Sequence, residues 1–201
     1  MRRLVLASSN PGKLREFHGL LAPLQWDVVS QTTLGIGEAE EPHMTFLENA
    51  LAKARHVASL SGLPALADDS GLCVPALGGE PGVQSARYAG EPRSDQRNND
   101  KLVQALASVE DRRAFYVCVL VFVESIQDPV PLVAEGRWAG EMLLLPRGDD
   151  GFGYDPLFYL PELGCTAAEL PPDRKNRMSH RAQALAQFHD RLRCGVTTEC
   201  P

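Results

Sequence analysis

Two adjacent carboxylates, Asp68 and Asp69, follow the apolar run at residues 63–66 and Ala67. Burying an ionised carboxylate is costly unless a cation, hydrogen-bond donors or water compensate it, and a metal ion would do so. Successive side chains of a strand point to opposite faces, so both carboxylates face one site only if the chain bends at Ser70–Gly71. A solvated turn is the alternative, because Asp, Ser and Gly are common turn residues. This segment alone leaves both interpretations open.

The sequence has few lysines, and one of them lies where a bound anion would be stabilised. Of 20 Lys and Arg residues only four are lysines. Residues 4–7 predict a buried strand, and residues 11–21 predict a helix with Asn10 as its N-cap. Lys13 then lies in the first helical turn, where the helix dipole disfavours a cation unless an anion binds there. The alternative is that Lys13 reaches into water.

A second helix is predicted to begin at Thr45, which forms a capping-box pattern with Glu48. Asn49 and Lys53 share one face of this helix with Thr45 because they are spaced four residues apart. That face could present Asn49 and Lys53 to a ligand, although a solvated face is the commoner explanation for such residues. An acidic, glycine-containing loop at residues 35–42 precedes the helix.

A glycine-flanked aromatic loop spans residues 148–158 and contains Phe152-Gly153-Tyr154-Asp155-Pro156. Glycine lets a backbone approach a ligand closely, and Phe152 or Tyr154 could stack on a flat base for about 1–3 kcal/mol. The alternative is a loop that its aromatic side chains pin to the core.

Three potential donors gather near the C-terminus. Lys175 precedes a helix that is predicted to begin at Ser179-His180-Arg181. These side chains could donate hydrogen bonds to a ligand, but a basic, solvated helix start is equally ordinary.

The elements that must position these residues alternate between strands and helices. Further strands are predicted at residues 26–29, 114–123, 130–134 and 140–145, and a helix at 94–107. The run at 114–123 is apolar almost throughout, as is typical of a central strand buried on both faces. The last two strands are predicted to be antiparallel because their connection is too short for a crossover helix. Together these elements predict an α/β fold around a central sheet, with two lobes and a cleft between them.

Length, composition and net charge favour a globular protein and disfavour membrane and nucleic-acid association. The 201 residues, 44% of them hydrophobic, predict a single globular domain over residues 1–195 and a flexible tail over 196–201. The N-terminal apolar run is too short for a signal peptide, so we expect a cytoplasmic protein without membrane association. A net charge of -6 disfavours nucleic acid as a partner. The five scattered cysteines are expected to be free thiols.

Several segments, in this order along almost the whole chain, resemble those of the inosine/xanthosine triphosphate pyrophosphatases. The segments are Ser8-Ser9-Asn10-Pro11-Gly12-Lys13, Thr45-Phe46-Leu47-Glu48-Asn49-Ala50 with Lys53, Ala67-Asp68-Asp69-Ser70-Gly71-Leu72, Ser85-Ala86-Arg87-Tyr88, Phe152-Gly153-Tyr154-Asp155-Pro156 and Ser179-His180-Arg181. Ser8-Ser9 departs from the more usual Thr-Gly of that family, which affects only the fine shape of the first loop.

The resemblance implies hydrolysis of ITP, dITP and XTP between the α and β phosphates, giving the nucleoside monophosphate and pyrophosphate. It also implies a Mg²⁺-dependent homodimer with a long, mixed central sheet. Asp69 is the implied proton acceptor for water. The implied metal ligands are Glu41, Asp68 and Asp69. The implied substrate-binding residues are Ser8, Ser9, Asn10, Pro11, Gly12, Lys13, Lys53, Ser70, Phe152, Gly153, Tyr154, Asp155, Lys175, His180 and Arg181.

Base selection has a physical basis within this hypothesis. Hypoxanthine and xanthine carry a 6-oxo acceptor where adenine carries a 6-amino donor, so donors from Lys175, His180 and Arg181 favour the former. Guanine also has a 6-oxo group, so its exclusion must depend on the 2-position. A non-catalytic nucleotide-binding module is the rival hypothesis. A phosphatase with an aspartyl nucleophile is disfavoured, because the first strand ends in Ser8-Ser9-Asn10 and not in Asp-x-Asp.

Overall fold

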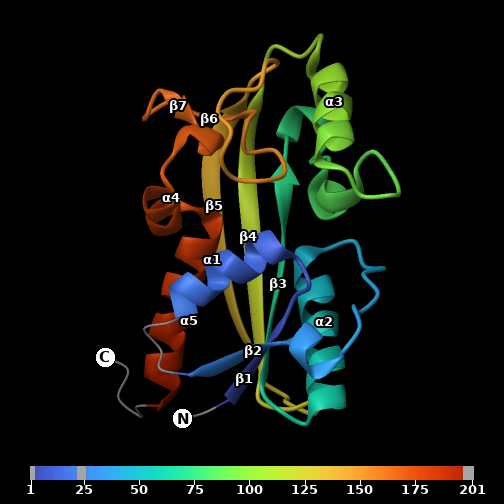
Figure 1. Ribbon diagram of the computed structural model, residues 1–201, viewed down its shortest axis with the longest axis vertical. Helices are drawn as coiled ribbons and strands as arrows, with labels where there is room; N and C mark the ends of the chain where they lie inside the picture. Colours follow the sequence, from blue (N-terminus) through green and yellow to red (C-terminus); the bar gives the residue numbers. More distant parts are fainter. Residues whose placement is uncertain (1–2, 22–25, 197–201) are drawn as a thin grey trace. The chain divides into compact units, whose positions relative to one another are not determined.

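A computed structural model describes residues 3–21 and 26–196 of the chain. Seven strands form one mixed sheet in the order β2-β1-β3-β4-β5-β6-β7 (Figure 1). Strand β1 pairs in parallel with β2 and β3, whereas β6 pairs antiparallel with β5 and β7. The α/β fold with a mixed sheet and flanking helices is therefore confirmed.

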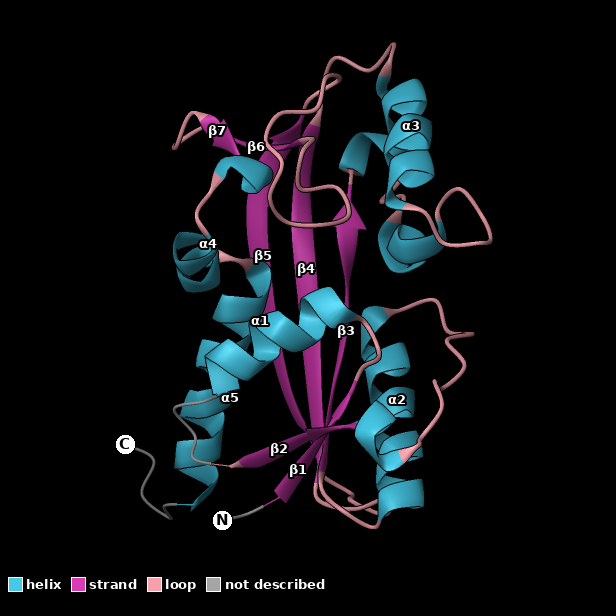
Figure 2. Cartoon of the chain, in the orientation of Figure 1, coloured by secondary structure: helices cyan, strands magenta, loops and turns pink. Residues whose placement is uncertain are grey.

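The strands are β1 (Arg3–Ala7), β2 (Asp27–Ser30), β3 (Ala65–Cys73), β4 (Arg113–Val123), β5 (Leu132–Met142), β6 (Phe158–Leu160) and β7 (Cys165–Thr166). The helices are α1 (Pro11–Leu21), α2 (Phe46–Ser61), α3 (Asp95–Leu106), α4 (Pro172–Met178) and α5 (His180–Val196) (Figure 2). Short 3-10 helices cover Gln31–Leu34, Pro75–Leu77, Gly82–Arg87 and Ala167–Glu169. Within the described ranges, no helix is both long and apolar enough to cross a membrane.

The chain divides into two compact units. Unit 1 contains residues up to 69, residues 118–136 and residues from 181 on, and unit 2 contains residues 70–117 and 137–180. The tail predicted at 196–201 lies outside the described residues except for Val196.

In unit 1, one buried cluster joins strands β1, β3 and β4 to helices α1 and α5. Its members include Leu6, Leu66 and Leu120 from the strands, Phe17 from α1 and Phe188 from α5. Helix α2 lies on the other side of these strands and buries Ala54 and Val57, among other residues (Figure 2). Because strand side chains alternate between faces, helices on both sides can each cover one set.

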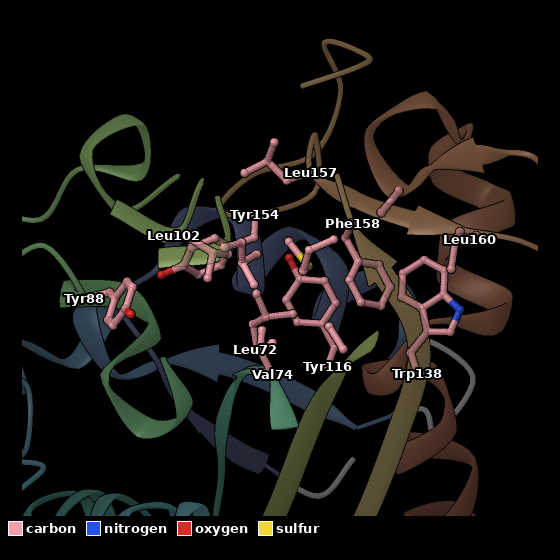
Figure 3. Packing of buried hydrophobic residues seen from close by; sticks show 14 of the residues in the cluster. Leu72, Val74, Tyr88, Leu102, Tyr116, Trp138, Tyr154, Leu157, Phe158 and Leu160 are labelled. Atoms are coloured by element: carbon pink, nitrogen blue, oxygen red, sulfur yellow. The ribbon is translucent and has the colours of Figure 1, made fainter. Parts of the chain in front are cut away.

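In unit 2, aromatic rings make up much of the buried core (Figure 3). The ring centroids of Tyr116 and Phe158 lie 4.6 Å apart, and those of Trp138 and Phe158 lie 5.5 Å apart. Tilted rings at these separations add to the stabilisation from apolar burial. Tyr154 of the aromatic loop at residues 148–158 belongs to this core and is 3% exposed.

Two expectations about the strands are wrong. Strand β3 continues through Asp68, Asp69 and Gly71 to Cys73, so the carboxylates lie within a strand and not in a turn. The two strands predicted at 130–134 and 140–145 are one continuous strand, β5. Helix α4 precedes Ser179 in a segment for which the sequence indicated no element.

Candidate active site

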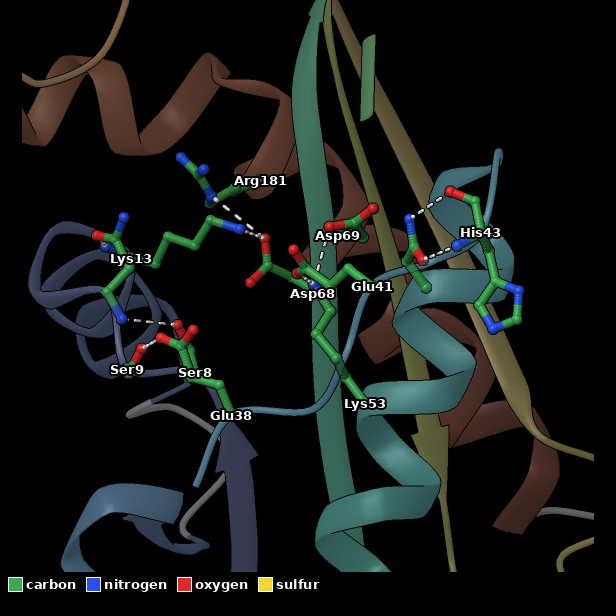
Figure 4. A network of polar contacts seen from close by, with 12 residues as sticks. Ser8, Ser9, Lys13, Glu38, Glu41, His43, Lys53, Asp68, Asp69 and Arg181 are labelled. Atoms are coloured by element: carbon green, nitrogen blue, oxygen red, sulfur yellow. Dashed lines mark hydrogen bonds and ion pairs between the residues drawn. The ribbon is translucent and has the colours of Figure 1, made fainter. Parts of the chain in front are cut away.

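Strand β3 carries the two carboxylates at the centre of the unit 1 site. Asp68 is 1% exposed and Asp69 is 7% exposed, although both would be costly to bury as isolated charges. Their side chains meet different lysines (Figure 4). Asp68 Oδ2 lies 2.9 Å from Lys13 Nζ, and Asp69 Oδ1 lies 2.8 Å from Lys53 Nζ. The alternation of the strand thus assigns one lysine to each carboxylate.

Lys13 is positioned by the turn between β1 and α1. Asn10 Oδ1 accepts hydrogen bonds from the backbone N–H groups of Gly12 at 2.8 Å and Lys13 at 3.1 Å. Asn10 therefore caps α1, as its sequence position predicts. Ser8 Oγ accepts from the backbone N–H of Asn10, and Ser9 Oγ donates to Glu38. The segment holds hydroxyls and a lysine together at a helix N-terminus.

Lys53 connects helix α2 to the acidic loop. Its Nζ lies 3.0 Å from Glu41 Oε1 as well as 2.8 Å from Asp69 Oδ1. The solvated face proposed as the commoner explanation for Asn49 and Lys53 is therefore wrong, since Asn49 is also 2% exposed. The sequence signal was the four-residue spacing, but only the fold shows that the loop covers this face.

Arg181 belongs to the same charged group. Its Nε lies 3.9 Å from Asp68 Oδ2, and the residue is 4% exposed. Lys13, Lys53 and Arg181 thus balance the three carboxylates Glu41, Asp68 and Asp69 in number.

The charges shift the pKa values of this group in different directions. Burial would raise the pKa of Asp68, but Lys13, Arg181 and Lys53 outweigh it and lower that pKa to about 2. Burial raises the pKa of Asp69, with a further contribution from Glu41, while Lys53 and Lys13 offset part of the increase. Burial would lower the pKa of Lys53, but Asp69, Asp68 and Glu41 raise it above its ordinary value. Lys53 therefore remains a cation, and Asp69 is the carboxylate of the pair that binds a proton more readily.

The chemistry of the donor set fits a hard divalent cation. Carboxylate oxygens are preferred ligands of Mg²⁺. Asp69 Oδ2 is buried and has no hydrogen-bond partner within residues 3–21 and 26–196. Over the same residues, no three His, Cys, Asp or Glu side chains already converge as a metal-binding cluster. The ammonium group of Lys53 lies 3.0 Å from Glu41 Oε1 and 2.8 Å from Asp69 Oδ1.

Unit 2 brings a different set of predicted residues together. Lys175 Nζ lies 2.8 Å from Asp155 Oδ2, and the two residues are 6% and 3% exposed. The backbone N–H of Phe152 donates to the same Asp155 oxygen at 2.9 Å, and Lys175 Nζ lies 5.0 Å from the centre of the Phe152 ring. The lysine and the aromatic ring are thus fixed by one buried carboxylate.

Tyr116 was not predicted as a site residue, yet it contacts two residues of this set. Its hydroxyl donates to Asp155 Oδ1 at 3.3 Å, and its ring stacks on His180 with centroids 4.7 Å apart and planes 10° apart. Its position in the buried run of β4 gave no signal, because strand aromatics are usually core residues.

The remaining predicted residues of this loop and of β3 make contacts with the protein core and with neighbouring elements. Tyr154 lies in the unit 2 core, and its hydroxyl donates to the Ser85 carbonyl at 2.9 Å. Two residues of α3 bind the backbone of Gly153: its N–H donates to Asp95, and its carbonyl accepts from Asn99. Ser70 continues β3 beyond the carboxylates. Phe152 is therefore the aromatic residue of this loop that remains outside the core.

Sequence and structure comparisons agree on the family. The model of the Ham1 family matches residues 4–191, and the chain belongs to this family. The chain is 66% identical over 196 residues to a dITP/XTP pyrophosphatase of Ralstonia nicotianae, covering 96% of this chain and 98% of that protein. It is 63% identical to a dITP/XTP pyrophosphatase of Bordetella pertussis, covering 100% and 96%.

Solved structures show the same fold. A HAM1 protein from Coxiella burnetii has a TM-score of 0.89 at 48% identity, covering 96% of this chain and 98% of that one. The Ham1 protein of Staphylococcus aureus has a TM-score of 0.86 at 38% identity, covering 98% and 100%.

Proposed function

We propose that the protein hydrolyses the noncanonical purine nucleoside triphosphates ITP, dITP and XTP to the monophosphate and pyrophosphate, and so removes them from the nucleotide pool. The observation that carries this proposal is strand β3, which presents Asp68 to Lys13 and Asp69 to Lys53. The relatives in Ralstonia nicotianae and Bordetella pertussis are named dITP/XTP pyrophosphatases, which supports this activity and two of the three substrates.

In this proposal the unit 1 cations bind the triphosphate. Phosphate oxygens replace carboxylates as partners of Lys13 and Lys53, and the loop from Ser8 to Gly12 supplies hydroxyls and backbone groups at the start of α1. The loop residues concerned are Ser8, Ser9, Asn10, Pro11 and Gly12. Ser70, next to Asp69 in β3, completes the proposed set.

Glu41, Asp68 and Asp69 are the proposed ligands of Mg²⁺. The three cations and three carboxylates already balance, so an added triphosphate requires further positive charge. Bound Mg²⁺ supplies that charge and makes a nearby water more acidic.

Asp69 is the proposed proton acceptor. It takes a proton from water as the water oxygen bonds to the α phosphorus, and the bond from that phosphorus to the bridging oxygen breaks to release pyrophosphate. Lys53 orients Oδ1 of Asp69, and because a bound Mg²⁺ would make the water more acidic, Asp69 need not have a high pKa.

Unit 2 carries the proposed base-binding residues. Lys175 and His180 donate to the 6-oxo group, and Phe152 stacks on the base. The third proposed donor, Arg181, is the first residue of the C-terminal part of unit 1. Asp155 orients Lys175 and the Phe152 backbone. Gly153 and Tyr154 shape the loop that carries Phe152. A site built on such bonds can reject the wrong partner by roughly 10⁴-fold.

The experiment is product analysis with ITP, XTP, GTP and ATP, with and without Mg²⁺. We expect IMP and pyrophosphate from ITP, slow turnover of ATP, and no turnover without a divalent cation. Equal turnover of ATP and ITP, or phosphate as the sole product, would contradict the proposal. Binding of ITP without hydrolysis would support the non-catalytic binding module instead.

We also propose that the enzyme acts as a homodimer in the cytoplasm, where its nucleotide substrates are used. Light scattering on the purified protein tests the first statement, and a mass of one chain at micromolar concentration would contradict it. Fractionation of the source cells tests the second.

A further inference from the structure

One face of helix α2 contacts the segment from Gly37 to His43 at three points. This segment contains most of the acidic loop at residues 35–42 and the residue that follows it. Asn49 bonds to the backbone of His43, Lys53 pairs with Glu41, and His56 Nε2 lies 3.2 Å from the carbonyl oxygen of Gly37. The three helix residues are spaced by four and three positions, which places them on one face. Successive positions along the helix therefore hold successively earlier residues of the loop.

The contact made by Asn49 is the most constrained of the three. Its Oδ1 accepts the His43 N–H at 3.0 Å, and its Nδ2 donates to the His43 carbonyl at 3.2 Å. Because Asn49 is 2% exposed, losing either hydrogen bond would leave a buried polar group without a partner, which is energetically costly. The oxygen and the nitrogen of one side-chain amide thus both bind His43, two positions after Glu41.

Lys53 holds the loop in a different way. Its long side chain reaches Glu41 through an ion pair, and in the proposed function a phosphate competes for the same ammonium group. That competition leaves the Asn49 bonds to His43 untouched. Asn49 is therefore the contact that can keep Glu41 near Asp69 when substrate engages Lys53.

We propose that Asn49 is a positioning residue: by binding both backbone groups of His43 it sets the position of Glu41 relative to Asp69. Its effect on turnover rests on the proposed function, whereas its effect on the loop does not. A displacement of about 1 Å at a reacting group can cost roughly 100-fold in rate. Asn49 acts through Glu41 and need not touch the substrate.

The test combines Asn49→Ala with a double-mutant cycle. We expect Asn49→Ala to lower kcat for ITP by roughly 10- to 100-fold while KM changes less than about threefold, since the phosphate-binding lysines remain. In a Glu41→Ala background, Asn49→Ala should lower kcat by less than about threefold, because the group it positions is already missing. Equal losses in both backgrounds would overturn the proposal.

A second readout does not depend on activity. Hydrogen exchange of the His43 amide, followed by NMR, should be at least about tenfold faster in Asn49→Ala, because its acceptor is gone. Unchanged exchange would overturn the proposed anchoring. If wild-type protein fails to hydrolyse ITP, the proposed function fails, and this measurement still decides whether Asn49 holds the loop.

Two further variants separate positioning from folding. Val57→Ala is the matched control: Val57 is a fully buried residue of α2 outside the three loop contacts, so its kcat should match that of wild type at a comparable Tm loss. An equal kcat loss in Val57→Ala would contradict the proposal. If Asn49→Ala does not fold, Asn49→Asp replaces it in the cycle, because its carboxylate retains the acceptor for the His43 N–H.

Discussion

Units 1 and 2 each bury a lysine against an aspartate, but the surroundings of the two pairs differ. In unit 1 the pair Lys53–Asp69 is part of a group of three cations and three carboxylates. In unit 2 the pair Lys175–Asp155 is surrounded by Phe152 and Tyr116. One pair lies among charges and the other among aromatic rings.

The difference indicates a division of labour. Phosphates are the same in every nucleoside triphosphate, so a charged site acts equally on all of them. Purine bases differ in the donors and acceptors on their ring edges, which positioned hydrogen-bond donors can distinguish, and their flat rings can stack on an aromatic side chain. We infer that unit 1 sets the rate for any bound triphosphate and that unit 2 sets which triphosphate is bound.

Asp69→Asn should have the largest effect. The amide cannot accept the proton of water, so we expect kcat for ITP and ATP to fall equally, by at least about 10³-fold. Steady-state kinetics with both substrates check this. Asp173→Asn, an exposed residue of α4, is the control and should retain wild-type rates. Retained activity in Asp69→Asn would remove Asp69 from the chemistry.

Lys175→Met should reduce selectivity by roughly 100-fold, measured as the ratio of kcat/KM for ITP to that for ATP. It should also lower the free energy of unfolding by about 3–5 kcal/mol, because Asp155 becomes a buried charge without its cation. Adding Asp155→Asn removes that charge. The double variant is therefore expected to regain the free energy of unfolding but not the selectivity for ITP over ATP. Recovery of both would contradict the assignment of base selection to Lys175.

Phe152→Leu should have a smaller effect that is shared by all substrates. Loss of base stacking is worth about 1–3 kcal/mol, so we expect KM to rise roughly tenfold or more for ITP and ATP alike. The selectivity ratio should stay within about threefold of wild type. A selective loss of ITP turnover would show that Phe152 contributes to reading the 6-position.

The smallest effect concerns His189 of α5, which burial shifts to a lower pKa while Asp190 partly opposes the shift. The unfolded chain therefore binds the proton more readily, so stability is lost as pH falls below the ordinary histidine pKa of about 6.5. His189→Gln should lose less Tm than wild type between pH 7.5 and pH 5.5. An equal Tm loss would assign the pH dependence to other groups.

The sequence predicts the locally encoded elements well. Asn10 and Pro11 mark the start of α1, Ser94 caps α3, and the apolar run of β4 is buried as expected. Each of these signals depends on residues within one turn or one strand. The six segments that resemble a known family also predicted the family, and the match of the Ham1 family model to residues 4–191 confirms that prediction.

The errors arose where distant residues decide the structure. Asp-Asp-Ser-Gly has turn propensity, but it continues β3, and Lys13 and Lys53 from other elements pair with its two carboxylates. The polar stripe of α2 looked solvated because the loop that covers it lies outside the helix.

Strand β5 was divided by its polar residues and glycines, although its buried positions alternate through much of its length. At Gly140 a Cβ atom would lie 2.6 Å from the Tyr159 carbonyl oxygen and 2.7 Å from the Phe158 ring. Glycine at this position allows the close approach of β6. The sequence of β5 alone gives no sign of this, because the neighbouring strand is distant in the chain.

The selectivity ratio in two matched lysine variants tests the division of labour most directly. The measurement is kcat/KM for ITP and for ATP in Lys13→Ala, from unit 1, and Lys175→Ala, from unit 2. We predict that Lys13→Ala lowers both values by a similar factor and preserves their ratio, whereas Lys175→Ala reduces the ratio toward one. A preserved ratio in Lys175→Ala, or a ratio lost in Lys13→Ala, would contradict the account.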